Sequence, residues 1–201
     1  MLTISESSWP EFIEQLPQLH LDYIAMNPDA RPLEAKIQTI AERDGYLGKD
    51  LIREIVVWGG NPHNIAERMW RANSEDGVRQ VTAAAMEVLD DPEAALGQIK
   101  GVHGLGDSFG TKILAMICPQ MHAIWDRVVR NALSRTLNPP SCYGDFLAAL
   151  RQTVLQISTP NPTRPESTWL VRDVDAGLFQ FGWPKHRGGN GGMIVGNLPS
   201  R

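Results

Sequence analysis

A glycine hairpin and a single downstream carboxylate are the residues of this chain whose types and spacing point most clearly to chemistry. The hairpin spans residues 102–106, with the sequence Val-His-Gly-Leu-Gly, and an apolar stretch then leads to Asp126. Glycines accept positive φ angles and keep side chains away from a close neighbour. The helix expected after the hairpin presents free N–H groups and a positive dipole end, which suit a phosphate. The pattern predicts a phosphate-binding turn linked to one acid.

Helical periodicity dominates the elements that must position these residues. A cap residue, a proline and an acid predict a helix start at Ser8. Further helices are expected at 33–43, 51–58, 65–73, 78–89, 91–99, 108–118, 126–137, 143–157 and 167–181. The alternating runs that mark half-buried strands are absent. The sequence therefore predicts an all-α protein.

Composition narrows the function classes. The chain has 201 residues, a hydrophobic fraction of 42% and a net charge of −4, which argues against a nonspecific nucleic-acid coat. Residues 100–135 nevertheless lean basic, which fits either a local phosphate-facing patch or ordinary surface charge. No membrane span or signal peptide is evident, so we expect a cytoplasmic protein. The two cysteines form no metal-ligand pattern.

The hairpin, the apolar helix and the aspartate together resemble the helix-hairpin-helix DNA glycosylase superfamily, the HhH-GPD fold. In that family a Leu-Pro-Gly-Val-Gly type hairpin binds DNA phosphates through backbone amides, and a catalytic aspartate begins a later helix. The family position two residues after the second glycine precedes that aspartate by eighteen residues. Ser108 precedes Asp126 by the same eighteen residues. The likeness covers residues 96–133.

The resemblance implies that Asp126 is the catalytic residue. Breaking an N-glycosidic bond builds positive charge on the deoxyribose, which a carboxylate stabilises while it accepts a proton from the attacking water. The structural alternative for Asp126 is a helix N-cap, a role that aspartate fills well and that is compatible with catalysis.

Ser108 marks a departure from part of the family. Strand-nicking members carry at this position a lysine that forms a Schiff base with the sugar. The chain therefore resembles monofunctional members, which use the aspartate and a water. Lys112 lies one helical turn further along on the same face, where it offers a displaced amine nucleophile or a contact to phosphate or solvent.

The resemblance also implies sites for the DNA backbone and for an extruded base. The expected DNA contacts are His103, Gly104, Leu105, Gly106, Ser108, Gly110, Lys112, Asn61 and Arg127. Asn61 and His63 occupy the region where glycosylases insert a residue into the gap left by a flipped base, although Asn-Pro also starts ordinary turns. Trp58 and Trp125 are the expected base-pocket residues, with core packing as the alternative.

The family architecture implies one helical domain in two lobes over residues 1–182. Residues 51–125 would form the central lobe, and residues 1–50 with 126–182 the terminal lobe. The glycine-rich stretch 183–201 is expected to be a flexible tail. Double-stranded DNA is the expected partner of a monomeric protein that needs no cofactor.

Three other functions fit the same residues. One is a noncatalytic DNA-binding module that keeps the hairpin. Another is a bifunctional glycosylase and lyase that uses Lys112. A helical protein-interaction domain becomes the better interpretation if the chain does not bind DNA. The sequence does not indicate which base is recognised, because pocket residues are scattered over several helices.

Overall fold

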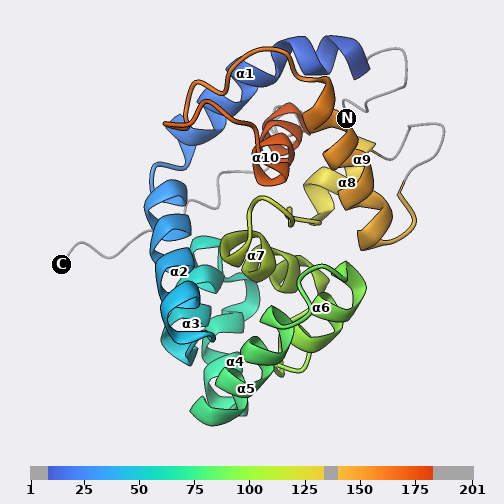
Figure 1. The fold of residues 1–201 in the computed structure, drawn as a ribbon. Coiled ribbons are helices and arrows are strands. Elements are labelled where there is room, and N and C mark those ends of the chain that lie inside the picture. Colours follow the sequence, from blue (N-terminus) through green and yellow to red (C-terminus); the bar gives the residue numbers. More distant parts are fainter. Residues whose placement is uncertain (1–8, 134–139, 183–201) are drawn as a thin grey trace.

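The computed structural model describes residues 9–133 and 140–182, which form helices joined by loops (Figure 1). No strand occurs among these residues, so the expected all-α class is confirmed. The helices are α1 (Trp9–Met26), α2 (Ala30–Asp44), α3 (Lys49–Trp58), α4 (Ile65–Ala72), α5 (Glu75–Met86), α6 (Pro92–Ile99), α7 (Asp107–Ile117), α8 (Arg127–Leu133), α9 (Tyr143–Gln156) and α10 (Val171–Gly182), with a 3-10 turn, η2 (Pro62–Asn64). The predicted tail at 183–201 lies outside the described residues.

The helices gather into two groups, which Figure 1 shows one above the other. In the upper group, α10 packs against α1, α8 and α9, and in the lower group, α7 packs against α2, α3 and α6. One continuous cluster of buried apolar side chains runs through both groups, from Phe12 in α1 through Ile113 in α7 to Leu178 in α10. The groups therefore share a single core.

The position of α2 corrects the expected lobe boundary. The prediction placed residues 1–50 with the C-terminal helices, but α2 packs against α7 and α3 in the lower group (Figure 1). Its buried face includes Leu33, Ile37 and Ala41, an apolar stripe at helical spacing that needs a helical partner. The chain thus passes from the upper to the lower group between Met26 and Ala30, about twenty residues before the expected boundary.

The start of α10 also differs from the prediction. Helix was expected from Ser167, but Ser167 has a φ of +56° and the helix begins at Val171. The carboxylate of Asp173 accepts a hydrogen bond from the Leu170 backbone N–H at 3.0 Å, which is half of a capping box. This contact fixes where the helix begins.

A buried polar cluster centred on Asp173 ties the upper group to the start of α2. The Asp173 oxygens accept hydrogen bonds from Arg31 at 2.8 Å, from Asn161 at 2.9 Å and from both Arg164 Nε at 2.7 Å and Nη2 at 2.9 Å. Burial opposes the charged form of Asp173, but the Arg164 hydrogen bonds and the charges of Arg31 and Arg164 outweigh it and hold the pKa of Asp173 below its usual value. Arg164 and Arg31 also form ion pairs with Glu34, the second carboxylate of the cluster.

Two buried histidines give the fold an acid-labile element. His20 accepts a hydrogen bond from Arg31 through Nε2, and His122 donates one from Nε2 to the Leu89 carbonyl. Burial lowers the pKa of each from 6.5 to about 4.

We expect the free energy of unfolding to fall as the pH drops from about 6.5 to about 4. A base whose pKa is depressed by folding stabilises the protein above its unfolded pKa, and that stability is lost as protons bind the unfolded chain. The shift corresponds to about 3 kcal/mol for each histidine. Folding raises the pKa of Asp175 to about 7, which makes an opposite contribution over this range, so a variant isolates the histidine contribution. Urea unfolding should show a shallower pH dependence for His122→Gln than for wild type. The same pH dependence in both proteins would contradict the assignment.

None of the described helices is long and apolar enough to span a bilayer. Several of the predicted site residues meet at the junction of the two groups of helices.

Candidate functional site

The hairpin joins α6 to α7 and needs glycine for two different reasons. Gly104 has a φ of +95°, a conformation that side chains resist. Gly106 does not: it is extended, with a φ of −105°, and a Cβ at this position would meet no atom within 4 Å. The expectation of positive φ is therefore correct for Gly104 and wrong for Gly106. The surface in front of Gly106 is open, which leaves its backbone accessible.

Asn73, at the C-terminus of α4, braces the hairpin. Its Oδ1 accepts a hydrogen bond from the His103 N–H at 2.8 Å, and its Nδ2 donates to the His103 carbonyl at 2.9 Å. The Leu105 side chain is buried beneath the turn, while His103, Gly104 and Gly106 are exposed. The hairpin is therefore a fixed turn whose backbone faces outward.

Gly110, which was expected to contact DNA, has a packing role in the structure. Gly110 is buried against α6, and a Cβ there would lie 2.7 Å from Leu96 Cδ1. Gly110 is thus a close-packing position between two helices, which corrects its prediction as a DNA contact. Asp107 opens α7 and pairs with Lys100 at 2.8 Å, so the exposed start of this helix carries balanced charges.

Lys112 lies on the buried side of α7. Its Nζ donates a hydrogen bond to Ser108 Oγ at 3.1 Å and lies 3.5 Å from Asp126 Oδ2, and the side chain is only 9% exposed. Burial lowers the pKa of Lys112, while the Asp126 carboxylate opposes this shift. Gly59, at the end of α3, packs against the stem: a Cβ there would lie 3.1 Å from Lys112 Cδ. The amine is therefore held in place rather than free in solvent.

Asp126 caps α8 and faces Lys112 at the same time. Its Oδ1 accepts hydrogen bonds from the N–H groups of Val128 at 2.9 Å and Val129 at 3.1 Å. These bonds fix one carboxylate oxygen and leave Oδ2 directed toward the ammonium. The capping role considered for this residue is thus real, and it orients the carboxylate.

The backbone that leads to Asp126 is held from both groups of helices. The Ile124 N–H donates to Asp175 Oδ2 of α10 at 2.5 Å, and the Trp125 N–H donates to Thr111 Oγ1 of α7 at 3.0 Å. Thr111 and Asp175 are both buried. One side chain from each group therefore positions the segment that carries the acid.

A cavity of about 390 Å³ opens at the junction of the two groups. Residues from α1, α3, α7, α8, α10 and the segment before α8 line it: Tyr23, Asn27, Trp58, Gly59, Gly60, Lys112, Ile124, Asp126, Val128, Val129, Arg172, Asp175 and Phe179. Its volume falls in the range of small-molecule sites. Asp126 and Lys112 share this cavity, so acid–base and nucleophilic groups face the same space.

Three charged or hydroxyl side chains of the cavity were not predicted from the sequence. Arg172 is buried, pairs with Asp175 and donates a hydrogen bond from Nη2 to the Tyr23 hydroxyl at 2.6 Å. Burial raises the pKa of Asp175 to about 7, although the Arg172 guanidinium pulls it down. Together with Lys112 and Asp126, these groups place two cations and two carboxylates around the cavity.

The two tryptophans expected at a base pocket separate in the structure. Trp58 lines the cavity. Trp125 does not: its ring packs on Phe146 of α9 at 4.4 Å between centroids, and it belongs to the core. The prediction of Trp125 as a base-pocket residue is therefore wrong, because its side chain points away from the cavity that its neighbour Asp126 lines.

Asn61 and His63, both in the loop between α3 and α4, have different surroundings. Asn61 is occupied as a brace of α4: its Oδ1 accepts from the Ala66 N–H at 2.8 Å and its Nδ2 donates to Glu67 at 3.2 Å. His63 is exposed and has a φ of +54°. The side chain of Asn61 is thus turned inward, whereas His63 faces solvent. Arg127, the first residue of α8, is also exposed.

Groups of three or more histidine, cysteine or acidic side chains that could hold a metal ion do not occur in residues 9–133 and 140–182. Comparison with protein-family models finds no match, and neither the curated proteins nor the solved structures give a significant match to this chain. The function must therefore be inferred from the hairpin, the cavity and the residues that face it.

Proposed function

We propose that this protein is a DNA glycosylase that hydrolyses the N-glycosidic bond of a damaged, mismatched or modified base flipped out of duplex DNA. The observation that carries the proposal is the placement of the Asp126 carboxylate on the wall of a cavity of about 390 Å³. The exposed hairpin and the resemblance of residues 96–133 to helix-hairpin-helix glycosylases support it.

In the proposed reaction, Asp126 stabilises the positive charge that develops on the deoxyribose as the base departs. Oδ1 is held by two backbone N–H groups, so the carboxylate has little freedom to turn away. The carboxylate also accepts a proton from the attacking water, whose oxygen bonds to C1′. The Asp126 side chain is only 14% exposed, and this partial burial strengthens its electrostatic interactions.

A panel of duplexes, each with one modified base, tests the proposal. Purified protein is incubated with each duplex, hot alkali then cleaves the strand at any abasic site, and the fragments are separated by size. We expect cleavage of at least one duplex. Intact strands throughout the panel would reject glycosylase activity, and salt-dependent DNA binding without cleavage would favour a noncatalytic helix-hairpin-helix module.

The hairpin offers a matched pair of substitutions that separates folding from DNA contact. Gly104→Ala should destabilise the protein by about 1–2 kcal/mol, because alanine resists the positive φ. Gly106→Ala should change stability by less than about 0.5 kcal/mol, since its Cβ meets nothing. It should nevertheless weaken DNA binding, because the new methyl group projects where a phosphate would approach the backbone. Thermal unfolding and fluorescence anisotropy with a labelled duplex measure the two effects. Unchanged DNA affinity in Gly106→Ala would exclude the hairpin from the interface.

A second candidate, a glycosylase with lyase activity, is favoured by the burial of Lys112. Burial lowers the pKa of this amine, which increases the fraction present as the free base that nucleophilic attack requires. In this mechanism the Nζ lone pair attacks C1′ as the base leaves with the electrons of the glycosidic bond, and the nitrogen loses a proton. The C1′–O4′ bond then breaks as O4′ takes up a proton, which gives a Schiff base with the opened sugar. The 3.5 Å separation between Nζ and Asp126 Oδ2 would let the carboxylate take the proton that the nitrogen loses.

Borohydride reduction distinguishes the two mechanisms. The lyase mechanism predicts a covalent protein–DNA complex with wild-type protein and its loss in Lys112→Gln. Lys100→Gln, which alters an exposed lysine at the end of α6, is the matched control and should still form the complex. Base release without a trapped complex would leave hydrolysis by water as the mechanism.

A further inference from the structure

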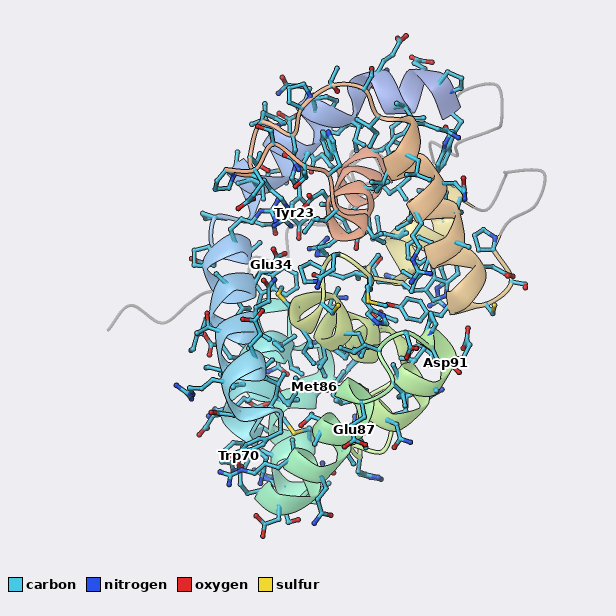
Figure 2. The ribbon with its side chains drawn as sticks, in the orientation of Figure 1. Tyr23, Glu34, Trp70, Met86, Glu87 and Asp91 are labelled. Atoms are coloured by element: carbon cyan, nitrogen blue, oxygen red, sulfur yellow. The ribbon has the colours of Figure 1, made fainter. Side chains whose placement is uncertain are left out.

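The last turn of α1 and the residue that follows the helix bring two polar side chains to the cavity that the proposed reaction does not use. Tyr23 and Asn27 both line it, four residues apart. Tyr23 is only 5% exposed and lies between the upper group and the start of α2, beside Glu34 (Figure 2). Neither residue belongs to the motif that carries the resemblance.

Arg172 determines which way the Tyr23 hydroxyl can act. A guanidinium only donates hydrogen bonds, so the contact of 2.6 Å between Arg172 Nη2 and the Tyr23 oxygen makes that oxygen an acceptor. Asp175 holds Arg172 in turn through an ion pair. The Tyr23 O–H is therefore left to donate elsewhere, and no described residue accepts it. Burial raises the pKa of Tyr23, so the hydroxyl keeps its proton.

Asn27 has the opposite polarity at the same wall. Its Nδ2 donates to the Tyr23 backbone carbonyl at 2.9 Å, which identifies the nitrogen end of the amide and leaves Oδ1 as the outer atom. Among the described residues, none donates a hydrogen bond to Asn27 Oδ1. The residues that line the cavity thus include one with an O–H donor and one with a carbonyl acceptor.

The remaining walls suit a flat and uncharged ligand. Trp58 and Phe179 supply aromatic surface, and Ile124, Val128 and Val129 supply aliphatic surface. The basic and acidic side chains of the cavity pair with each other, Lys112 with Asp126 and Arg172 with Asp175. A neutral aromatic ring with a polar edge fits this combination.

We propose that Tyr23 and Asn27 recognise the lactam edge of a base, with the Tyr23 O–H donating to a ring carbonyl and Asn27 Oδ1 accepting from the adjacent ring N–H. The inference rests on the proposed function for the nature of the ligand. It assigns the substrate to bases that carry a carbonyl beside a ring N–H, such as uracil or hypoxanthine. Cytosine and adenine present the reverse pattern, an amino donor beside a ring nitrogen acceptor.

The orientation of the base in the cavity determines whether the protein can distinguish the two hydrogen-bonding patterns. The glycosidic bond must point toward Asp126, so a base with the reverse pattern cannot turn over to match the two side chains. Such a base would place its amino donor against the Tyr23 O–H donor. A site whose buried polar groups are left unpaired in this way rejects the wrong ligand strongly. We expect the lactam base of each pair to bind at least about tenfold more tightly than its amino counterpart.

Binding of 2′-deoxynucleosides, which keep the glycosidic bond and therefore the orientation of the base, tests this without requiring DNA contact. Ligand-observed NMR titrations compare deoxyinosine with deoxyadenosine and deoxyuridine with deoxycytidine, for wild-type protein and for Tyr23→Phe. The substitution keeps the ring that contacts Phe179 and removes only the hydroxyl. Tyr46→Phe, which makes the same change at a residue outside the cavity, is the matched control. Asn27→Ala provides a second variant at a partly exposed position, where folding is less at risk.

We expect the lactam preference in wild type and Tyr46→Phe, and its reduction to below about threefold in Tyr23→Phe and Asn27→Ala. Four outcomes would overturn the proposal. Two are equal binding within each pair and a preference for the nucleosides of the amino bases. The others are a preference that survives in both folded variants and no binding of any of the four nucleosides at its solubility limit. Base discrimination without excision from any duplex would instead reject the glycosylase function and leave the recognition of the lactam edge intact.

Discussion

An Asp126→Asn variant should lose base excision by about 10²- to 10⁴-fold while it remains folded. The neutral amide neither stabilises positive charge on the sugar nor takes a proton from water. It can, however, still cap α8, because asparagine accepts the same hydrogen bonds from Val128 and Val129. The substitution therefore removes the charge and keeps the cap, and it breaks the ion pair with Lys112.

Single-turnover excision kinetics, together with thermal unfolding, measure this effect on the most active duplex of the panel. Asp91→Asn is the matched control, because Asp91 caps α6 in the same way by accepting from the Ala94 N–H at 3.0 Å. That variant should retain full activity. Excision by Asp126→Asn at the wild-type rate would remove Asp126 from the mechanism and return it to a purely structural role.

Replacing Asp173 with alanine should destabilise the protein by about 3–5 kcal/mol, the largest effect on stability that we expect. The carboxylate is buried and accepts five hydrogen bonds from Arg31, Arg164, Asn161 and the backbone N–H of Leu170. Without it, two guanidinium groups remain in a buried cluster with only Glu34 as a carboxylate partner. The loss also removes the hydrogen bond that fixes the start of α10.

Urea unfolding at neutral pH measures this prediction. Asp44→Ala serves as the comparison, because Asp44 forms a bidentate pair with Arg43 on an exposed helix end. Such surface pairs contribute little, so we expect a change much smaller than that of Asp173→Ala. A loss of similar size in both variants would show that the Asp173 cluster contributes no more than a surface pair.

The helices were largely predictable because their apolar faces and stop signals are local. The ends of α3, α6 and α7 agree with the expectations within two residues, since Gly59, Asp91 and the Cys118-Pro119 pair mark them. The start of α10 was not predictable. It depends on Asp173, whose partners Arg31 and Asn161 are distant in the sequence.

Only the part of the site that lies between the hairpin and Asp126 in the sequence was predictable. Ser108, Lys112 and Asp126 lie within one short segment, and the structure brings them into one hydrogen-bonded group. The opposite wall comes from α1 and α10, which no local pattern connects. One signal was present: Arg172, Asp173 and Asp175 interrupt an apolar helix, and charges on a buried helix require partners. The sequence does not indicate that one of those partners would be Tyr23.

The two hydrogen bonds that hold the segment before Asp126 have a mechanical consequence. Ile124 is tied to Asp175 in the upper group, and Trp125 is tied to Thr111 in the lower group. If the two groups moved apart, at least one of these bonds would stretch, and the carboxylate would leave the position next to Lys112. The acid is therefore correctly placed only while both halves of the molecule are closed together, so its alignment reports on the whole fold rather than on one helix.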